Sequence, residues 1–401
     1  MALLLIILMY LSLFITFYWI QVIFVKDSKI GKLKTFPKVT VAIPAYNEES
    51  GIAQTISSVL SLDYPKNKLE IIVVDDGSTD KTREIVAGFK NVRLITQRQA
   101  GKAAALNNAL RNSNGEFFAC LDADSRVEKD ALKNLIHHFS DKEVASVIAA
   151  IKVEKPETLW GKFQWHEYLM SAFARRLMSR VNSLNMTPGV FSFYRKEVLS
   201  SVGGFDEKNI TEDFEIAMRL HKNGYKVKIE NKSVGYTNAP QKFSSLVKQR
   251  ERWARGYIYN GFKYKEMFFN KKYGILGTFH LPVTLLTLGI LMFTSIFTIF
   301  KLTNFMLNAL FDIIELKTLF FRLIEIPNWL FILTLDYILY LPIIIGFGLA
   351  LYSFYKARGL AREKLRYPFA FIAYLAYFGF FHSYVWLRSI TKEIAKAKRI
   401  W

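Results

Sequence analysis

Cysteine is almost absent from this sequence: Cys120 is the only one among 401 residues. A single cysteine excludes an internal disulfide, so packing and hydrogen bonding must stabilise the fold. Cys120 lies within an apolar run, Phe117–Leu121, where we expect it to fill a small core position. The length is sufficient for two or three domains.

Charged residues are absent between Ala2 and Val25. This stretch also lacks the basic start and small-residue cleavage site of a signal peptide. Since about 20 apolar residues cross a bilayer, we predict that residues 1–25 form a retained N-terminal transmembrane helix. Three more apolar segments, at about 274–300, 329–355 and 368–387, predict a C-terminal transmembrane region over 274–387. The chain is thus expected to be a multi-pass protein of the cell membrane, with the lipid bilayer as a partner and residues 26–273 as a polar domain.

Acidic residues are few, 34 Asp and Glu against 54 Lys and Arg. A formal charge of +20 could indicate nucleic acid, but cytoplasmic flanks of membrane spans carry such a surplus, so no nucleic-acid partner is predicted. Directly after the first span come Lys26, Lys29, Lys32, Lys34 and Lys38, opposed by Asp27 alone. This asymmetry predicts a cytoplasmic polar domain. Nothing in the sequence indicates an oligomeric state.

The course of the C-terminal segments is left open by charge. Four spans would place the basic tail, residues 388–401, outside the cell, against the charge rule. The conflict disappears if one apolar segment is re-entrant, or if residues 302–325 enter the bilayer. The sequence supports both alternatives.

Strand and helix patterns alternate through the polar domain, which predicts an α/β fold with a doubly wound, largely parallel sheet. Three of the expected strands end in polar or acidic clusters, on what should be one edge of the sheet. The strands are expected at 39–43, 71–74, 92–96, 117–121 and 144–151, with helices at about 51–60, 80–89, 100–111 and 129–139.

Carboxylates follow two of these strands, at Asp75-Asp76 and at Asp122-Ala123-Asp124. Paired oxygen ligands at a rigid strand end suit Mg²⁺ or Mn²⁺, which then holds a substrate phosphate. The plainer interpretation is a solvated turn. Lys102, after Gly101 at a helix start, could meet the same phosphate or simply be solvated. Neither G-x-x-x-x-G-K-[ST] nor G-x-G-x-x-G occurs, so the usual cradles for nucleoside triphosphates and dinucleotides are lacking.

Later segments carry further polar residues on expected helices. Thr211-Glu212-Asp213 precedes a helix and, taken alone, is a good N-terminal cap. Gln249–Trp253 contains an Arg and a Trp that could hold a phosphate and a sugar ring, although many exposed helices contain both. Two basic amphipathic helices, at about 159–180 and 243–264, are expected to lie at the membrane interface or to pack as ordinary surface helices.

The order of these motifs resembles one family. The ordered motifs are Pro44-Ala45-Tyr46-Asn47-Glu48, Asp75-Asp76-Gly77-Ser78, Gly101-Lys102, Asp122-x-Asp124, Gly203-Gly204-Phe205 through Thr211-Glu212-Asp213, and Gln249-x-x-Arg252-Trp253. They resemble the membrane-embedded family 2 glycosyltransferases, which include poly-N-acetylglucosamine, chitin-oligosaccharide, hyaluronan and cellulose synthases. The resemblance covers about residues 38–260 and implies a GT-A fold inserted between transmembrane helices.

The resemblance also implies roles for single residues. Tyr46, Glu48 and Asp76 match the family's nucleotide site, and Lys102 lies near the uridine or phosphate. Asp122 and Asp124 match the metal and diphosphate site. Asp213 matches the general base. Gln249, Arg252 and Trp253 match the motif that holds the diphosphate and the acceptor sugar.

The activity implied is an inverting, metal-dependent transfer with Mg or Mn. The donor expected is a UDP-sugar such as UDP-N-acetylglucosamine, and the acceptor is a growing β-linked polysaccharide at the membrane. The alternative is a non-processive enzyme that places one sugar on a lipid acceptor. An inactive membrane scaffold or translocation partner is a remote alternative, against which the intact Asp122, Asp124, Asp213 and Arg252 argue.

Overall fold

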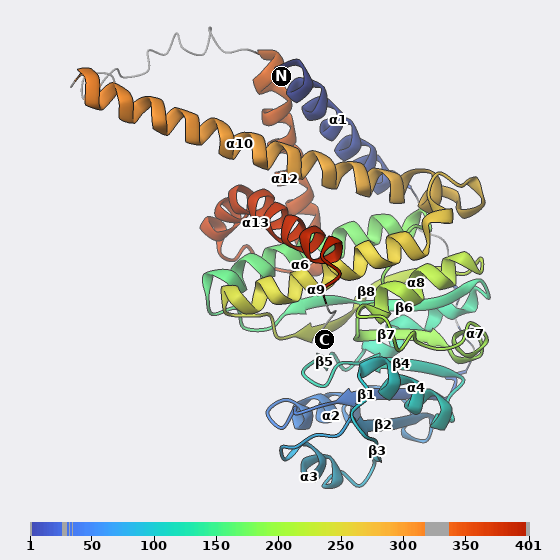
Figure 1. Cartoon of the computed structure of the whole chain (residues 1–401). Helices are drawn as coiled ribbons and strands as arrows, with labels where there is room; N and C mark the ends of the chain where they lie inside the picture. The colour runs from blue at the N-terminus through green and yellow to red at the C-terminus, as the bar shows by residue number, and fades with distance from the viewer. Residues whose placement is uncertain (1, 26–29, 32, 34, 317–336, 398–401) are drawn as a thin grey trace.

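The computed structural model describes residues 2–25, 30, 31, 33, 35–316 and 337–397. An α/β domain forms one end of the molecule (Figure 1). At the opposite end of the molecule, three apolar helices extend away from the sheet: α1 (Ala2–Gln21), α10 (Leu281–Leu316) and α12 (Tyr337–Ala361).

One eight-stranded sheet, in the order β3-β2-β1-β4-β7-β6-β8-β5, forms the centre of the domain. Its strands are β1 (Val39–Ala45), β2 (Leu69–Asp75), β3 (Arg93–Thr96), β4 (Phe117–Leu121), β5 (Arg126–Val127), β6 (Val144–Val153), β7 (Val190–Arg195) and β8 (Lys226–Thr237). Strands β3, β2, β1 and β4 are parallel, as predicted. The sheet is nevertheless mixed, because β7 pairs antiparallel with both β4 and β6, and β5 pairs antiparallel with β8. Periodicity could not show this, since an apolar run reads alike in either direction.

Helices cover both faces of the sheet, which confirms the predicted α/β class. They are α2 (Ile52–Leu60), α3 (Thr82–Ala87), α4 (Lys102–Asn112), α5 (Ala131–Leu135), α6 (Leu159–Arg180), α7 (Lys196–Ser201), α8 (Glu212–Lys222) and α9 (Phe243–Lys263). One apolar cluster joins α2, α3 and α5 to one face, and a second joins α4, α7 and α8 to the other. The helix expected at 129–139 is shorter than predicted, because a 3-10 helix (Ile136–Ser140) continues it.

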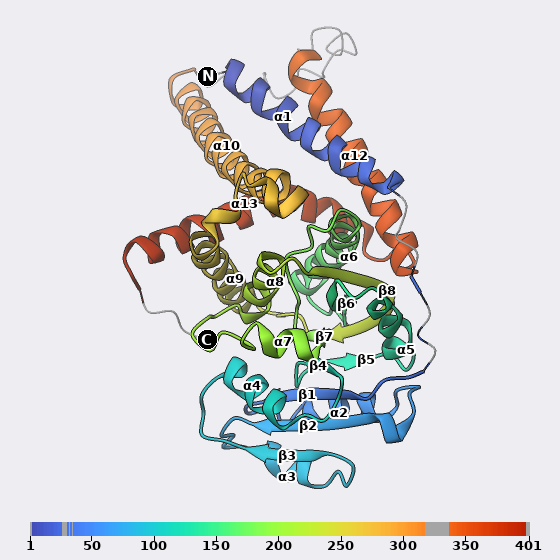
Figure 2. The same ribbon diagram turned by 90° about the vertical axis from the view of Figure 1, so that its right-hand side faces the viewer.

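The two predicted amphipathic helices are α6, with the expected bounds, and α9, which ends one residue early. They form a layer between the sheet and the apolar helices (Figure 2). A third apolar cluster joins α6 to α12, to α13 (Pro368–Ile394) and to the end of α1, through residues such as Phe163, Phe354, Phe371 and Trp19. The α/β domain and the apolar helices therefore pack together through α6.

Three helices of the described chain are long and apolar enough to cross a membrane: Ile6–Phe24, Leu276–Asn308 and Pro368–Ile394. The first predicted C-terminal segment, 274–300, overlaps the second of these ranges from residue 276 onward, and the third, 368–387, lies within the last. Of the predicted 329–355 segment, residues 337–355 belong to α12, and 329–336 lie outside the described residues. Helix α13 also continues seven residues into the predicted basic tail, 388–401. Residues 398–401 of that tail lie outside the described residues.

Helix α13 lies across the layer of α6 and α9 rather than along α1, α10 and α12 (Figure 2). Just before its first residue, the carbonyl of Tyr367 bonds to His166 of α6 at 3.1 Å. Near its other end, Glu393 pairs with Arg255 of α9 at 2.6 Å. A 27-residue helix is about 40 Å long. Both of its ends nevertheless contact helices of the α/β domain.

Candidate active site

The carboxyl ends of three neighbouring parallel strands, β2, β1 and β4, meet at one edge of the sheet, as the sequence predicts. In the register of β1 and β2, Ala45 lies beside Asp75. The Asp122-Ala123-Asp124 segment continues from the end of β4. These acids share an edge because the strands run in the same direction, and ligands of open α/β sheets bind at such an edge.

Lys102 connects Asp122 to a further acid, Glu212. Its ammonium lies 2.5 Å from Asp122 Oδ1 and 3.2 Å from Oε1 of Glu212, the first residue of α8. Burial alone would lower the pKa of Lys102, but the two carboxylates outweigh it and raise that pKa. Lys102 therefore stays charged. Glu212 itself is buried, which raises its pKa even though Lys102 opposes the shift.

Asp124 and Glu48 carry unfavourable negative charge. Burial raises the pKa of Asp124, and the charge of Asp122 adds to the effect. Burial also raises the pKa of Glu48 to about 7, with Asp124 and Asp122 as further causes. Such a group of carboxylates is stabilised by a cation placed among them.

A divalent cation fits these residues when a substrate completes its shell. Within the described part of the chain, no three His, Cys, Asp or Glu side chains could hold a metal by themselves. Mg²⁺ commonly takes one or two carboxylates and completes its shell with water and substrate phosphates. Asp122 and Asp124 can supply the two carboxylates.

The segment Thr187–Gly189 lies between this edge and Asp213. The carbonyl of Gly189 accepts a hydrogen bond from the Asp122 N–H at 3.0 Å. At the other end of the segment, the hydroxyl of Thr187 donates to the Asp213 carbonyl at 2.7 Å, and its N–H donates to the same oxygen at 3.1 Å. Three residues thus connect the two predicted ends of the reaction centre.

Asp213 is the second residue of α8. Thr211 occupies the N-cap position, as expected, but its side chain makes no capping hydrogen bond. Its Oδ1 accepts the Phe214 N–H at 2.9 Å, which leaves Oδ2 with no hydrogen bond to the described chain. The side chain is partly exposed. Such a carboxylate can accept a proton from a bound hydroxyl group.

Asp76 has a clear structural role. Its carboxylate accepts hydrogen bonds from Gln97 Nε2 at 2.7 Å, from the Ala100 N–H at 2.9 Å and from the Gly101 N–H at 2.8 Å. These bonds fix the loop that leads into Lys102. They also occupy the Gly101 N–H directly before α4. Tyr46 is 42% exposed beside this edge, where a nucleotide base can contact its ring.

The Gln249–Trp253 segment lies on α9. Arg252 Nη1 donates to the Ile210 carbonyl at 3.0 Å, and its charge acts on Glu212. Trp253 is 36% exposed, and the guanidinium of Arg250 lies 4.0 Å from the centre of its ring. Gln249 accepts a bond from that same guanidinium at 2.7 Å. Arg252 thus approaches the start of α8, whereas Gln249 and Trp253 are held through Arg250.

Sequence reasoning gave no role to the residues that position these groups. Glu212 was noted only as part of a cap, yet Lys102 contacts it. Asn260 of α9 donates to Thr211 Oγ1 at 3.1 Å and accepts from Asn209 at 2.7 Å, which joins α9 to the start of α8. A β-carbon on Gly256 would lie 2.2 Å from Thr211 Oγ1, so this contact requires a glycine. The only signal in the sequence was the polar Asn209 ahead of Thr211-Glu212-Asp213.

The sequence matches one family description, Glycosyl transferase family 2, over residues 40–203. The poly-beta-1,6-N-acetyl-D-glucosamine synthase of Staphylococcus epidermidis is 32% identical over 268 residues, covering 62% of this chain and 64% of the relative. The synthase of the same name from Staphylococcus aureus (strain COL) is 33% identical over 224 residues, 54% of each protein. The chain therefore aligns with less than two thirds of the length of these relatives.

A solved structure shares the fold over nearly the whole chain. The mannosyltransferase PcManGT from Pyrobaculum calidifontis, in complex with GDP-Man and Mn²⁺, superposes with a TM-score of 0.61. The match covers 98% of this chain and 99% of that protein at 19% sequence identity. It confirms the GT-A type of fold together with the flanking helices.

Proposed function

Because the chain carries a family 2 glycosyltransferase domain, we propose that it transfers a sugar from a UDP-sugar to a hydroxyl group at the cytoplasmic side of the membrane, with inversion at the anomeric carbon. The observation that carries the proposal is the Thr187–Gly189 segment. It connects the main chain of Asp122 to that of Asp213, which supports one site with Asp122 and Asp124 on one side and Oδ2 of Asp213 on the other. A donor diphosphate would lie on the first side and the acceptor hydroxyl on the second.

Asp213 acts as the base. As the acceptor oxygen forms its bond to the anomeric carbon, the hydroxyl proton passes to Asp213 Oδ2, and the bond from the anomeric carbon to the diphosphate breaks. One direct displacement inverts the configuration, so an α-linked donor gives a β-linked product. Arg252 and Lys102 place positive charge near the leaving diphosphate.

Asp122 and Asp124 would hold a divalent cation, Mg²⁺ or Mn²⁺. When bound, this ion offsets the charge that develops on the leaving group. Tyr46, Glu48 and Asp76 would surround the nucleotide, and Gln249 and Trp253 would contact the diphosphate and the acceptor sugar. Trp253 is partly exposed, so a sugar could contact the part of its ring that Arg250 does not cover.

The relatives with 32–33% identity are named as poly-β-1,6-N-acetyl-D-glucosamine synthases, which supports UDP-N-acetylglucosamine as donor and a β-linked polysaccharide as acceptor. The second candidate is a single transfer to a lipid. It is favoured by the arrangement of the apolar helices, since within the described chain only α1, α10 and α12 extend away from the catalytic domain. Three helices from one chain are few to enclose a polysaccharide channel.

A donor panel separates these candidates. Purified protein, reconstituted in lipid vesicles with Mg²⁺ or Mn²⁺, is incubated with radiolabelled UDP-N-acetylglucosamine, other UDP-sugars and GDP-mannose, and the products are sized. We expect incorporation from a UDP-sugar that EDTA abolishes. A polymer supports the synthase, a labelled lipid supports single transfer, and transfer from GDP-mannose alone would contradict the donor assignment. No product from any donor would favour a scaffold.

A further inference from the structure

A basic groove lies between α6 and α12, apart from the candidate active site. It is a cavity of about 480 Å³ that adjoins a larger one of about 750 Å³ and shares five lining residues with it. The shared residues are Arg176, Arg180, Gly359, Leu360 and Arg362. We call this smaller cavity the α6–α12 groove.

Positive charge dominates the groove. Its lining includes five basic side chains and one acid: Arg176, Arg180, Lys356, Arg358, Arg362 and Glu363. The acid is already engaged, since Glu363 Oε1 lies 2.9 Å from Lys152 Nζ. Guanidinium groups remain charged at any physiological pH, and each can donate two parallel hydrogen bonds to a phosphate group. The lining of the larger cavity has a more balanced charge, because it also includes the acids Glu128, Asp130 and Glu230.

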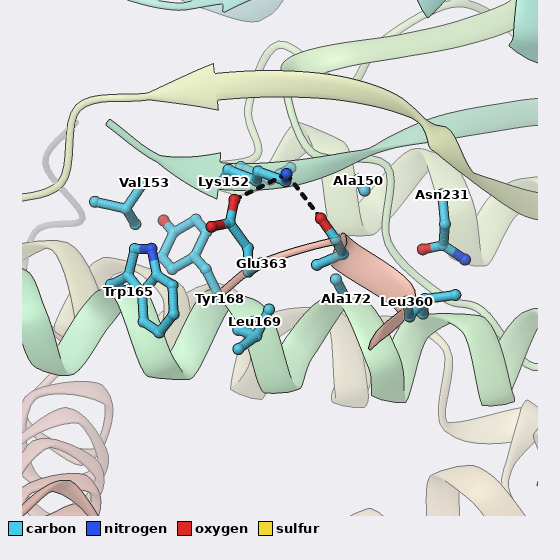
Figure 3. Close-up of a pocket in the computed structure, with 12 residues that line it drawn as sticks. Ala150, Lys152, Val153, Trp165, Tyr168, Leu169, Ala172, Asn231, Leu360 and Glu363 are labelled. Carbon is cyan, nitrogen blue, oxygen red and sulfur yellow. Dashed lines mark hydrogen bonds and ion pairs between the residues drawn. The ribbon is translucent and has the colours of Figure 1, made fainter. Parts of the chain in front are cut away.

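Both walls of the groove are fixed to the catalytic domain. Lys152 of β6 contacts Glu363 and donates to the Ala361 carbonyl at 2.9 Å, which ties the end of α12 to the sheet (Figure 3). Arg180 of α6 donates to the Ile23 carbonyl at 2.6 Å, which ties the end of α1 to α6. The basic side chains are therefore presented on two helices whose spacing is set before any ligand arrives.

The groove opens at the level where the apolar helices meet the catalytic domain. Ile23, which belongs to the last turn of a candidate span, lines it together with Phe173, Leu177 and Tyr355. Beside it, Phe24 is 77% exposed and Tyr355 is 68% exposed. An occupant would thus meet both positive charge and apolar side chains, with the exposed Phe24 next to the groove in sequence.

We propose that the α6–α12 groove binds the headgroup of an anionic phospholipid of the cytoplasmic leaflet, with the acyl chains along Ile23, Phe24 and Tyr355. The charge fits a phosphate, and clusters of Lys and Arg at the cytoplasmic end of an apolar helix or on an amphipathic helix bind anionic headgroups. A soluble phosphate would use the arginines but gain nothing from the apolar side. The proposal does not depend on the transfer activity.

The test is lipid binding by the full-length protein in detergent, followed by native mass spectrometry and by thermal unfolding. Phosphatidylglycerol is titrated against phosphatidylcholine. The test variant is K356Q/R362Q, and the matched control is R83Q/K90Q, which removes the same charge from exposed positions around α3, far from the apolar helices. We expect phosphatidylglycerol to bind the native protein and the control alike and the test variant at least tenfold more weakly, while the charge-conserving K356R/R362K retains binding.

Two further arms separate the sources of phosphate. Inorganic phosphate and UDP are added at the concentration at which phosphatidylglycerol saturates the protein. Neither should stabilise the protein as the lipid does, and neither should displace the bound lipid. Equal binding of the two lipids, an unchanged affinity in K356Q/R362Q, or displacement by inorganic phosphate would each overturn the proposal. Unfolding temperatures in phosphatidylcholine alone show whether the variants are folded. The stabilisation by phosphatidylglycerol is then measured as the rise of each variant's unfolding temperature above its own value in phosphatidylcholine.

Discussion

The main chain of Gly189 lies directly against the carboxylate of Asp122. A β-carbon on Gly189 would be 2.3 Å from Asp122 Oδ1 and 2.6 Å from Lys102 Nζ, which is closer than real contacts allow. Two residues earlier, Thr187 holds the carbonyl of Asp213. A short segment therefore connects Asp122 to Asp213, and a side chain at its Gly189 end would displace the ends of Asp122 and Lys102.

Gly189→Ala should abolish transfer by displacing Asp122 and Lys102. We expect a loss of at least a hundredfold in turnover and a weakened affinity for UDP, measured by isothermal titration in detergent. The matched control is Gly261→Ala on α9, where nothing lies within 4 Å of the new methyl group and the helix favours alanine. If Gly189→Ala kept full activity, the close contact would have no functional importance.

Asp213→Asn should remove transfer while leaving donor binding intact. An asparagine can still accept the Phe214 N–H through its oxygen, so the start of α8 should stay in place. Only the proton acceptor is lost, and loss of a general base commonly costs a factor of about 10² to 10⁴. UDP affinity and turnover are measured on the same sample. Full turnover would show that Asp213 is not the base.

Lys102→Met should destabilise the protein because it leaves Glu212 buried without its cation. Removing one partner of a buried ion pair costs about 3–5 kcal/mol. In the double variant K102M/E212Q the buried charge is gone, so most of the lost unfolding temperature should return. UDP binding should stay weak in both variants, because Lys102 itself is missing. Recovery of UDP binding in the double variant would reduce Lys102 to a structural role.

Glu48 should make the metal-free protein less stable as pH rises. Its pKa of about 7 in the folded protein lies above the usual value of 4.5, so the folded state favours the protonated form. The stability that Glu48 contributes is therefore fully present below about pH 4.5 and is lost as pH rises through about 7. In EDTA, the unfolding temperature of the native protein should fall more between pH 5 and 8 than that of Glu48→Gln.

Adding Mn²⁺ should reduce the difference between the two proteins, since a cation offsets the charge of Asp122 and Asp124. Parallel pH profiles in EDTA for the native protein and Glu48→Gln would contradict the shift.

Much of the parallel half of the domain could be predicted from local patterns. Strand β4 and helix α6 have the predicted bounds, because an apolar run and an amphipathic period are local properties. The shared edge of Asp75 and Asp122 followed from parallel pairing. By contrast, the antiparallel strand β7 and the Glu212–Lys102 contact depend on which distant segments meet, and that is decided by packing rather than by local sequence.

The path of α13 is the second feature that composition could not decide. Its apolar content predicts a span, yet Glu251 of α9 pairs with Arg388 at 2.7 Å near its C-terminal end, and α6 contacts its beginning. A helix that crossed the bilayer would separate its ends by the full membrane thickness of about 30 Å. We therefore expect α13 to lie along the interface, with the basic tail on the side of the catalytic domain, where the charge rule also places it.

Cysteine labelling can test this path, because the native Cys120 is buried and should not react. Lys396→Cys marks the tail and Lys90→Cys marks the catalytic domain, and both positions are exposed. In sealed right-side-out vesicles, a membrane-impermeant maleimide should label neither variant, and permeabilisation should expose both. Labelling of Lys396→Cys before permeabilisation, with Lys90→Cys still protected, would mean that α13 crosses the membrane and that its contacts with α9 do not form in the bilayer.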